Sequence, residues 1–217
     1  TDRVFKGRGI RTCVFCMLFA GLCALGFWYL PQGAPIWQAT LLLMGTGFFL
    51  YGNHTQLLDA YIPPLAAFPK RAYTVAGPDS VSIPGIRHLV MMLGALPIPT
   101  ERGAMRGFLE AVSARCGEKA CVAIYPEAHI WPWYTGIRPF PDTSFSYPVR
   151  DNVPAVAFTT TFRKRKVFRN LWPCLTVTLS EPFYPDPELK PREARKVLRD
   201  RVSDFMSRTA ESPDNYA

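Results

Sequence analysis

Residues 47–59 read GFFLYGNHTQLLD, a stretch in which an apolar run gives way abruptly to polar residues. Its first part, residues 47–52, is an apolar and aromatic run of strand length, which is typical of a buried β-strand. Polar residues follow at once, with Asn53 and His54 side by side and Asp59 five residues after the histidine. Ligands of open α/β sheets bind where strands end, so His54 stands where a functional residue is expected.

The spacing of His54 and Asp59 limits how the two side chains can meet. On one continuous helix they would point about 140° apart. They meet only if His54 lies in a loop and Asp59 in the first turns of the next helix, which Thr55 could cap. A carboxylate on one imidazole nitrogen leaves the other free to take a proton. Because no serine, cysteine or lysine adjoins the pair, we expect His54 to deprotonate a substrate hydroxyl that attacks a thioester.

Two other interpretations of this stretch remain open. His54 could cap a helix while Asp59 is an ordinary solvated surface residue. Residues 53–55 also have the N-x-T pattern of a glycosylation acceptor, which is common by chance.

After residue 52, strand-like and helix-like segments alternate. Further strands are expected at 73–76, 93–98, 120–125, 153–160 and 174–180. Helices are expected at 55–67, 84–92, 103–116 and 192–208. The alternation predicts an α/β fold, with a mostly parallel central sheet flanked by helices. We place this domain at 46–208 and expect residues 209–217 to form a flexible C-terminal tail.

The N-terminal part of the chain has the character of a membrane segment. Residues 13–30 are eighteen positions without a charge, just long enough for a membrane helix. Basic residues precede this run and Trp28 and Tyr29 close it, as in segments whose basic flank faces the cytoplasm. We therefore expect residues 1–45 to be a membrane-associated helix or helical hairpin on the cytoplasmic face of the membrane. A buried core helix and a signal peptide are the alternatives.

Composition narrows the choice of partners. The chain has 217 residues, and the 48% that are hydrophobic exclude extensive disorder. Its net charge of +8 fits a nucleic acid, an anionic lipid or an acidic substrate as partner. The basic run at 163–166 is either a solvated turn or a contact with anionic lipid. We expect no nucleic-acid partner because no known binding motif is visible. The six cysteines complete no zinc ligand set, so neither a metal site nor disulfides are expected.

Four segments resemble, in the same order, motifs of the 1-acylglycerol-3-phosphate acyltransferase family. Residues 53–59 (NHTQLLD) are similar to the NHx4D motif, and residues 93–99 (LGALPIP) to the strand before the second, arginine-bearing motif. Residues 125–127 (YPE) resemble the start of the F-P-E-G-T-R block, and residues 153–156 (VPAV) the late V-P motif. The resemblance covers most of the chain after the apolar N-terminal run.

The resemblance implies acyl transfer from acyl-CoA or acyl-carrier protein to the hydroxyl of a lysophospholipid. The first expected acceptor is 1-acylglycerol-3-phosphate, which would give phosphatidic acid. His54 would be the general base and Asp59 its orienting carboxylate, with Asn53 and Glu127 helping to shape the substrate site. Arginines match phosphate oxygens, and the candidates to bind the acceptor are Arg102, Arg106 and Arg138. No metal or bound cofactor is needed, since the acyl donor is a substrate.

The chain departs from the family in one block. Where the family has G-T-R after P-E, this sequence has Ala128-His129-Ile130 followed by the W-P-W of residues 131–133. The arginine of the block is missing, and Arg138 is the candidate to supply its charge. A non-catalytic membrane lipid-binding protein on the same fold is therefore the alternative function. The expected partners are membrane phospholipid, lysophospholipid and the acyl donor, and the sequence does not predict an oligomeric state.

Overall fold

The computed structural model of the protein describes residues 45–79, 87–165, 173–213 and 215. The apolar run expected to associate with a membrane lies outside these residues. Within the part of the chain that is described, no helix is both long and apolar enough to cross a bilayer. The chain divides into two compact units, Thr1–Gln38 and Ala39–Ala217, and every element below belongs to the second.

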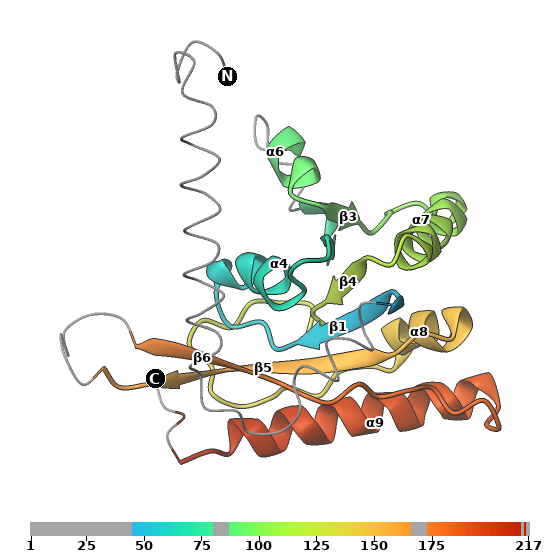
Figure 1. Cartoon of the computed structure of the whole chain (residues 1–217). Coiled ribbons are helices and arrows are strands. Elements are labelled where there is room, and N and C mark those ends of the chain that lie inside the picture. The colour runs from blue at the N-terminus through green and yellow to red at the C-terminus, as the bar shows by residue number, and fades with distance from the viewer. Residues whose placement is uncertain (1–44, 80–86, 166–172, 214, 216–217) are drawn as a thin grey trace, which may run out of the picture. The chain divides into compact units, whose positions relative to one another are not determined.

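A six-stranded sheet forms the centre of this unit, in the order β3-β2-β4-β1-β5-β6 (Figure 1). The strands are β1 Phe48–Gly52, β2 Ala72–Ala76, β3 Ala95–Pro97, β4 Cys121–Ile124, β5 Ala155–Arg163 and β6 Cys174–Leu179. All neighbours pair in parallel except β5 and β6, which are antiparallel. The predicted mostly parallel α/β sheet is therefore confirmed.

Helices cover both faces of the sheet. The α-helices are α4 Ile62–Ala66, α6 Arg87–Met92, α7 Met105–Gly117, α8 Ser146–Asp151 and α9 Pro191–Ala210, and the 3-10 turns are η1 Leu57–Tyr61, η2 Arg102–Ala104 and η3 Thr143–Phe145. One apolar core lies between the sheet and α7, α8 and α9, and a smaller one lies beneath α4. The two long helices, α7 and α9, both pack on the face of the larger core. The two faces of the sheet are therefore covered unequally.

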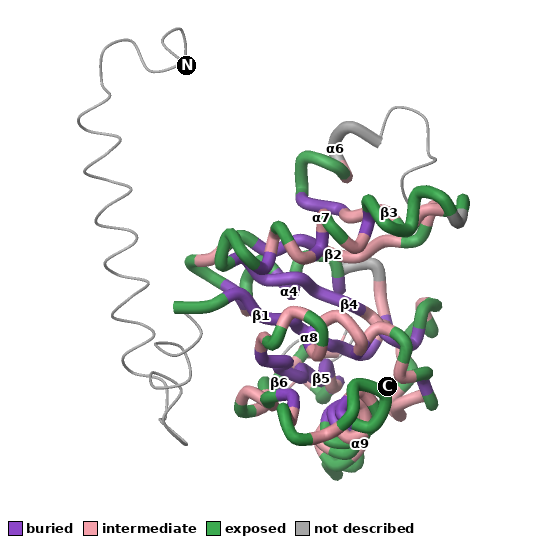
Figure 2. The backbone as a smooth tube through the Cα atoms, turned by 90° about the vertical axis from the view of Figure 1, so that its right-hand side faces the viewer, coloured by how far each residue is buried: buried purple, intermediate pink, exposed green. Residues whose placement is uncertain are grey.

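The central strand β1 is buried on both sides, as expected for a parallel strand between helical layers. Phe49 and Tyr51 point into the larger core, while Phe48 and Leu50 point into the smaller one. Figure 2 shows buried residues along the central strands and many exposed residues on the outer helices. The aromatic run of residues 48–52 thus forms the middle of the sheet.

The helix expected at 55–67 is shorter and less regular than predicted. The chain instead makes the turn η1 and then the five-residue helix α4. Pro63 and Pro64 explain the change, because proline suits the first turn of a helix but cannot donate to one that began earlier. The predicted cap is also wrong, since Gln56 rather than Thr55 occupies the cap position of η1.

The C-terminal helix α9 packs on β5 and extends the predicted 192–208 by one residue at its start and two at its end. Its buried residues recur every four positions, at Ala194, Leu198, Val202 and Met206. Asn215, in the stretch expected to be a tail, donates to the carbonyls of Thr135 and Ala210 and accepts from the N–H of Phe162.

Candidate active site

The site begins where β1 leaves the sheet. Gly52 pairs with Phe158 of β5, and a Cβ at this position would overlap the Phe158 ring. Only glycine therefore lets the aromatic ring of β5 pass so close to the end of β1. Because β1 and β4 are parallel neighbours that end at the same level, with Tyr51 beside Ile124, the loops that follow them meet.

Asn53 anchors the loop after β1 to β5. Its side chain is buried, donates from Nδ2 to the carbonyl oxygen of Thr160 at 3.0 Å, and accepts at Oδ1 from the N–H of Thr160 at 2.8 Å. The amide thus pairs with Thr160 as a backbone peptide group would, after the backbone ladder has ended. We expected Asn53 at the substrate; its two bonds instead fix the loop that carries His54.

His54 and Asp59 meet as the spacing predicted, with His54 in the loop and Asp59 in η1. The imidazole Nδ1 lies 3.0 Å from Asp59 Oδ2, and the two side chains are 20% and 0% exposed. The same oxygen accepts from the N–H groups of Thr55 at 2.6 Å and Gln56 at 2.9 Å. Because Nδ1 faces a carboxylate, the favoured tautomer of the neutral imidazole carries its proton on Nδ1 and its lone pair on Nε2.

Tyr125, the first residue after β4, contacts both members of this pair. Its ring stacks on the His54 imidazole with centroids 4.5 Å apart and planes inclined by 23°. Its hydroxyl donates to the backbone carbonyl of Asp59 at 2.6 Å. Burial, assisted by the nearby Asp59, raises the pKa of Tyr125 well above its ordinary value, so the phenol stays protonated as a donor.

Glu127 and Arg138 form a buried ion pair beside the loop. Arg138 donates to the Glu127 carboxylate through Nε at 3.3 Å, Nη2 at 3.1 Å and its backbone N–H at 3.1 Å. Its Nη2 also reaches the carbonyls of Glu127 and His129. The two side chains are 1% and 16% exposed, and the backbone N–H of His54 lies 3.5 Å from Glu127. The expected site residues Glu127 and Arg138 are therefore brought together, bonded mainly to each other.

The divergent block after P-E pairs with the His54 loop through its backbone. Trp131 donates its N–H to the carbonyl of His54 at 3.0 Å, and Trp133 to that of Thr55 at 3.2 Å. The Arg138 guanidinium lies 4.8 Å from the centre of the Trp131 ring, which is 51% exposed. Ala128 has a backbone φ of +66°, in the left-handed region that glycine favours.

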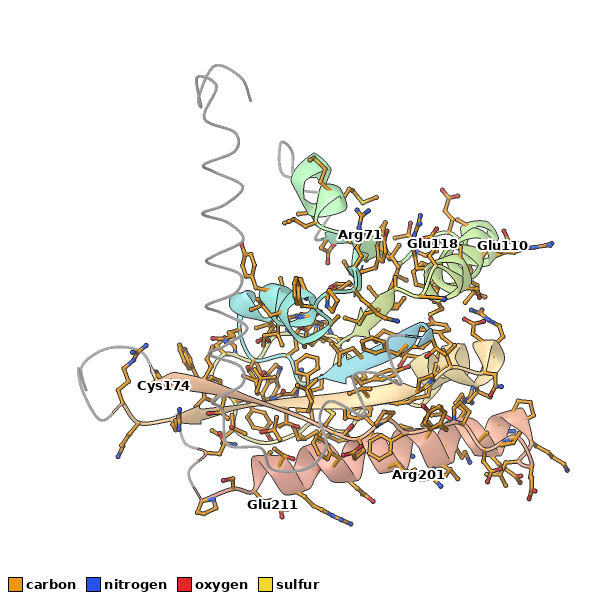
Figure 3. All side chains as sticks on the ribbon, viewed as in Figure 1. Arg71, Glu110, Glu118, Cys174, Arg201 and Glu211 are labelled. Carbon is orange, nitrogen blue, oxygen red and sulfur yellow. The ribbon has the colours of Figure 1, made fainter. Side chains whose placement is uncertain are left out.

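The other two expected arginines lie in the segment that follows β3, in η2 and α7. Arg102 is in η2, and its side chain is not among those described. Arg106, in α7, pairs with Glu110 one turn away at 3.0 Å, with side chains 89% and 66% exposed; Figure 3 shows Glu110 on the outer side of α7. Their segment follows β3, which β2 and β4 separate from β1, so the structure does not bring Arg106 to His54.

Two contributors were not singled out as site residues from the sequence. Tyr125 was noted only as part of a motif, although its place directly after a buried strand was a usable signal. Thr160 acts through its backbone, which leaves no mark in the sequence. Within residues 45–79, 87–165, 173–213 and 215, no group of three potential ligands could hold a metal ion.

Comparisons with known proteins identify the family and the fold of the chain. A model of the acyltransferase family matches residues 37–158, more than half of the chain. The fold is similar to that of the 1-acyl-sn-glycerophosphate acyltransferase PlsC from Thermotoga maritima, with a TM-score of 0.54 and 18% identity over 76% of this chain and 67% of that one. No curated protein matches the sequence significantly. From the family match, which includes His54, Asp59 and Glu127, the chain belongs to the acyltransferase family.

Proposed function

We propose that the protein transfers a fatty acyl group from acyl-CoA or acyl-carrier protein to the hydroxyl of a lysophospholipid. The first candidate acceptor is 1-acylglycerol-3-phosphate, with phosphatidic acid as the product. The observation that carries the proposal is the contact between His54 Nδ1 and the buried carboxylate of Asp59, in a chain of this family. The named activity of the similar Thermotoga maritima protein supports the choice of acceptor.

In the proposed reaction, His54 Nε2 removes the proton of the acceptor hydroxyl as its oxygen attacks the thioester carbonyl carbon. Asp59 stabilises the imidazolium that forms, since its carboxylate faces the protonated Nδ1. The tetrahedral intermediate then expels the thiolate by breaking the carbon–sulfur bond. The proton held by His54 passes to the thiolate, so that an ester and a free thiol leave and the base is regenerated.

The buried pair of Glu127 and Arg138 supports this chemistry indirectly. Each Arg138 bond to Glu127 ties residue 138 to the loop whose backbone pairs with His54 and Thr55. Because the guanidinium already binds a carboxylate and two carbonyls, we propose that Arg138 holds this loop rather than the acceptor phosphate. The acceptor phosphate would then need another cation. Of the expected arginines Arg102 remains the candidate, since the structure does not bring Arg106 to His54.

The proposed substrates are membrane lipids, and the surface of the domain suits a bilayer. Large apolar side chains on or beside α4 and α6 are well exposed: Leu65, Phe68, Met92 and Leu93 are 63% to 78% accessible. Lys70 and Arg71 follow Phe68 after one intervening proline, Pro69. Apolar residues next to cations are suited to the headgroup region of an anionic membrane. We propose attachment to the cytoplasmic face, with residues 1–45 as the anchor.

The decisive experiment is thiol release from a long-chain acyl-CoA by the purified protein in detergent. It is run with 1-acylglycerol-3-phosphate and a panel of other lysolipids, and repeated with acyl-carrier protein as donor. His54→Ala should lower acceptor-dependent release by about 10²- to 10⁴-fold, while Arg201→Gln on the exposed side of α9 serves as the unaffected control. No acceptor-dependent release with either donor would refute the enzyme and favour the lipid-binding alternative.

A further inference from the structure

Tyr125 is the residue at this site that touches both the base and the backbone of its carboxylate partner. Its ring lies on the His54 imidazole, while its hydroxyl reaches the Asp59 carbonyl. On another side, its ring meets Phe158 edge-on, with centroids 5.8 Å apart and planes at 87°. Phe158 in turn occupies the space left by Gly52. The position of the Tyr125 ring is therefore fixed by β5, and the ring in turn bounds the position of His54.

The hydroxyl contact fixes the turn that carries the carboxylate. The Asp59 carbonyl accepts the hydrogen bond of the Ile62 N–H that ends η1, and the phenol is its second donor. A carbonyl has two lone pairs, so both donors can be accommodated. Through this bond the loop after β4 holds the backbone of Asp59, whose side chain holds His54.

We propose that Tyr125 is a positioning residue, whose stacked ring holds the His54 imidazole against the Asp59 carboxylate. The proposal rests on the function proposed for this pair as a general base. The stacked ring also faces the charge that appears when His54 takes a proton, and an aromatic face attracts a cation. Tyr125 would thus favour the imidazolium during the reaction without touching the substrate.

The first test separates the hydroxyl from the ring by kinetics. Tyr125→Phe removes only the hydroxyl and should lower kcat about 3- to 10-fold, the effect of one hydrogen bond, with the acceptor KM unchanged. Tyr125→Leu also removes the aromatic face and should lower kcat further. Tyr184→Phe is the matched control, because Tyr184 is a half-exposed tyrosine remote in sequence from His54. Unchanged kcat in both Tyr125 variants would overturn the proposal.

The second test does not require activity, so it still applies if the proposed function fails. The chain has three histidines, and the imidazole ¹⁵N signals that disappear in His54→Ala belong to His54. In Tyr125→Phe, the Nδ1 proton of His54 should exchange with water about 3- to 10-fold faster than in wild type, the effect of losing one hydrogen bond. A variant that melts at a lower temperature but keeps wild-type His54 signals would show that Tyr125 merely stabilises the fold, and would refute the positioning role.

Discussion

The two hydrogen bonds between the Asn53 side chain and the Thr160 backbone allow a quantitative prediction of how much Asn53 stabilises the fold. Asn53→Ala deletes both hydrogen bonds and leaves the N–H and carbonyl of Thr160 without their partner at a position that is 2% exposed. These groups face β1, and β6 pairs on the other side of β5, so no neighbouring strand can replace the lost amide.

The expected loss of stability follows from the two unpaired groups. A buried donor or acceptor without a partner costs about 1–3 kcal/mol. Partial entry of water into the vacated space offsets part of this, so Asn53→Ala should lower the free energy of unfolding by about 2–4 kcal/mol. Against a total of about 5–15 kcal/mol for an ordinary domain, this is a large fraction.

The assay is urea unfolding in detergent solution, followed by intrinsic tryptophan fluorescence. With a denaturant dependence of about 2 kcal/mol per M, the midpoint should fall by about 1–2 M. Thr160→Val is the matched control at the same contact: it keeps the backbone and removes a buried hydroxyl that finds no partner among the described residues. That variant should be as stable as wild type or slightly more so. An Asn53→Ala midpoint within about 0.3 M of wild type would refute the reasoning.

Three further predictions concern single positions. Ala128→Gly should raise the free energy of unfolding by about 0.5–1 kcal/mol in the same assay, because the backbone φ of +66° strains a residue that has a Cβ. Gly52→Ala should destabilise by about 1–3 kcal/mol through overlap with Phe158, and adding Phe158→Leu should recover part of the loss, which a double-mutant cycle measures. Burial raises the pKa of Cys116 from 9.0 to about 12, so between these pH values the folded protein keeps a proton that the unfolded chain releases. The free energy of unfolding should therefore fall as pH rises from 9.0 to about 12. Thermal unfolding at several pH values should show a smaller fall in Cys116→Ala than in wild type.

The sequence was sufficient for the sheet and for the central pair of the site. An apolar strand, a short loop and an acidic residue in the next turn leave one way for His54 and Asp59 to meet, and their atoms lie 3.0 Å apart. The strands after residue 52 were found because each is a short apolar run. Helix α8 was not foreseen, since its six residues are too few to show a helical period.

The rest of the site depends on partners that are distant in sequence. Asn53 bonds to a backbone 107 residues away, and backbone groups are the same at every position. The partner of Arg138 is Glu127, eleven residues earlier, but this pairing depends on the path of the loop through residues whose φ values include +66° and +61°. The short motif around Glu127 predicted that these residues are important, and only the geometry indicates which contacts they make.

The order of strands in the sheet has a consequence for how the protein acquires its shape. His54, Tyr125 and Thr160 follow or lie on β1, β4 and β5, and β1 lies between the other two strands. The hydrogen bonds from Tyr125 to Asp59 and from Asn53 to Thr160 close loops of 66 and 107 residues. Such long loops form slowly because chain entropy opposes them. During refolding, α7 and α9 can form from local contacts well before these loops close. A refolding chain should therefore gain helix first. The contact between His54 and Asp59 should take its final geometry only when β4, β1 and β5 pair.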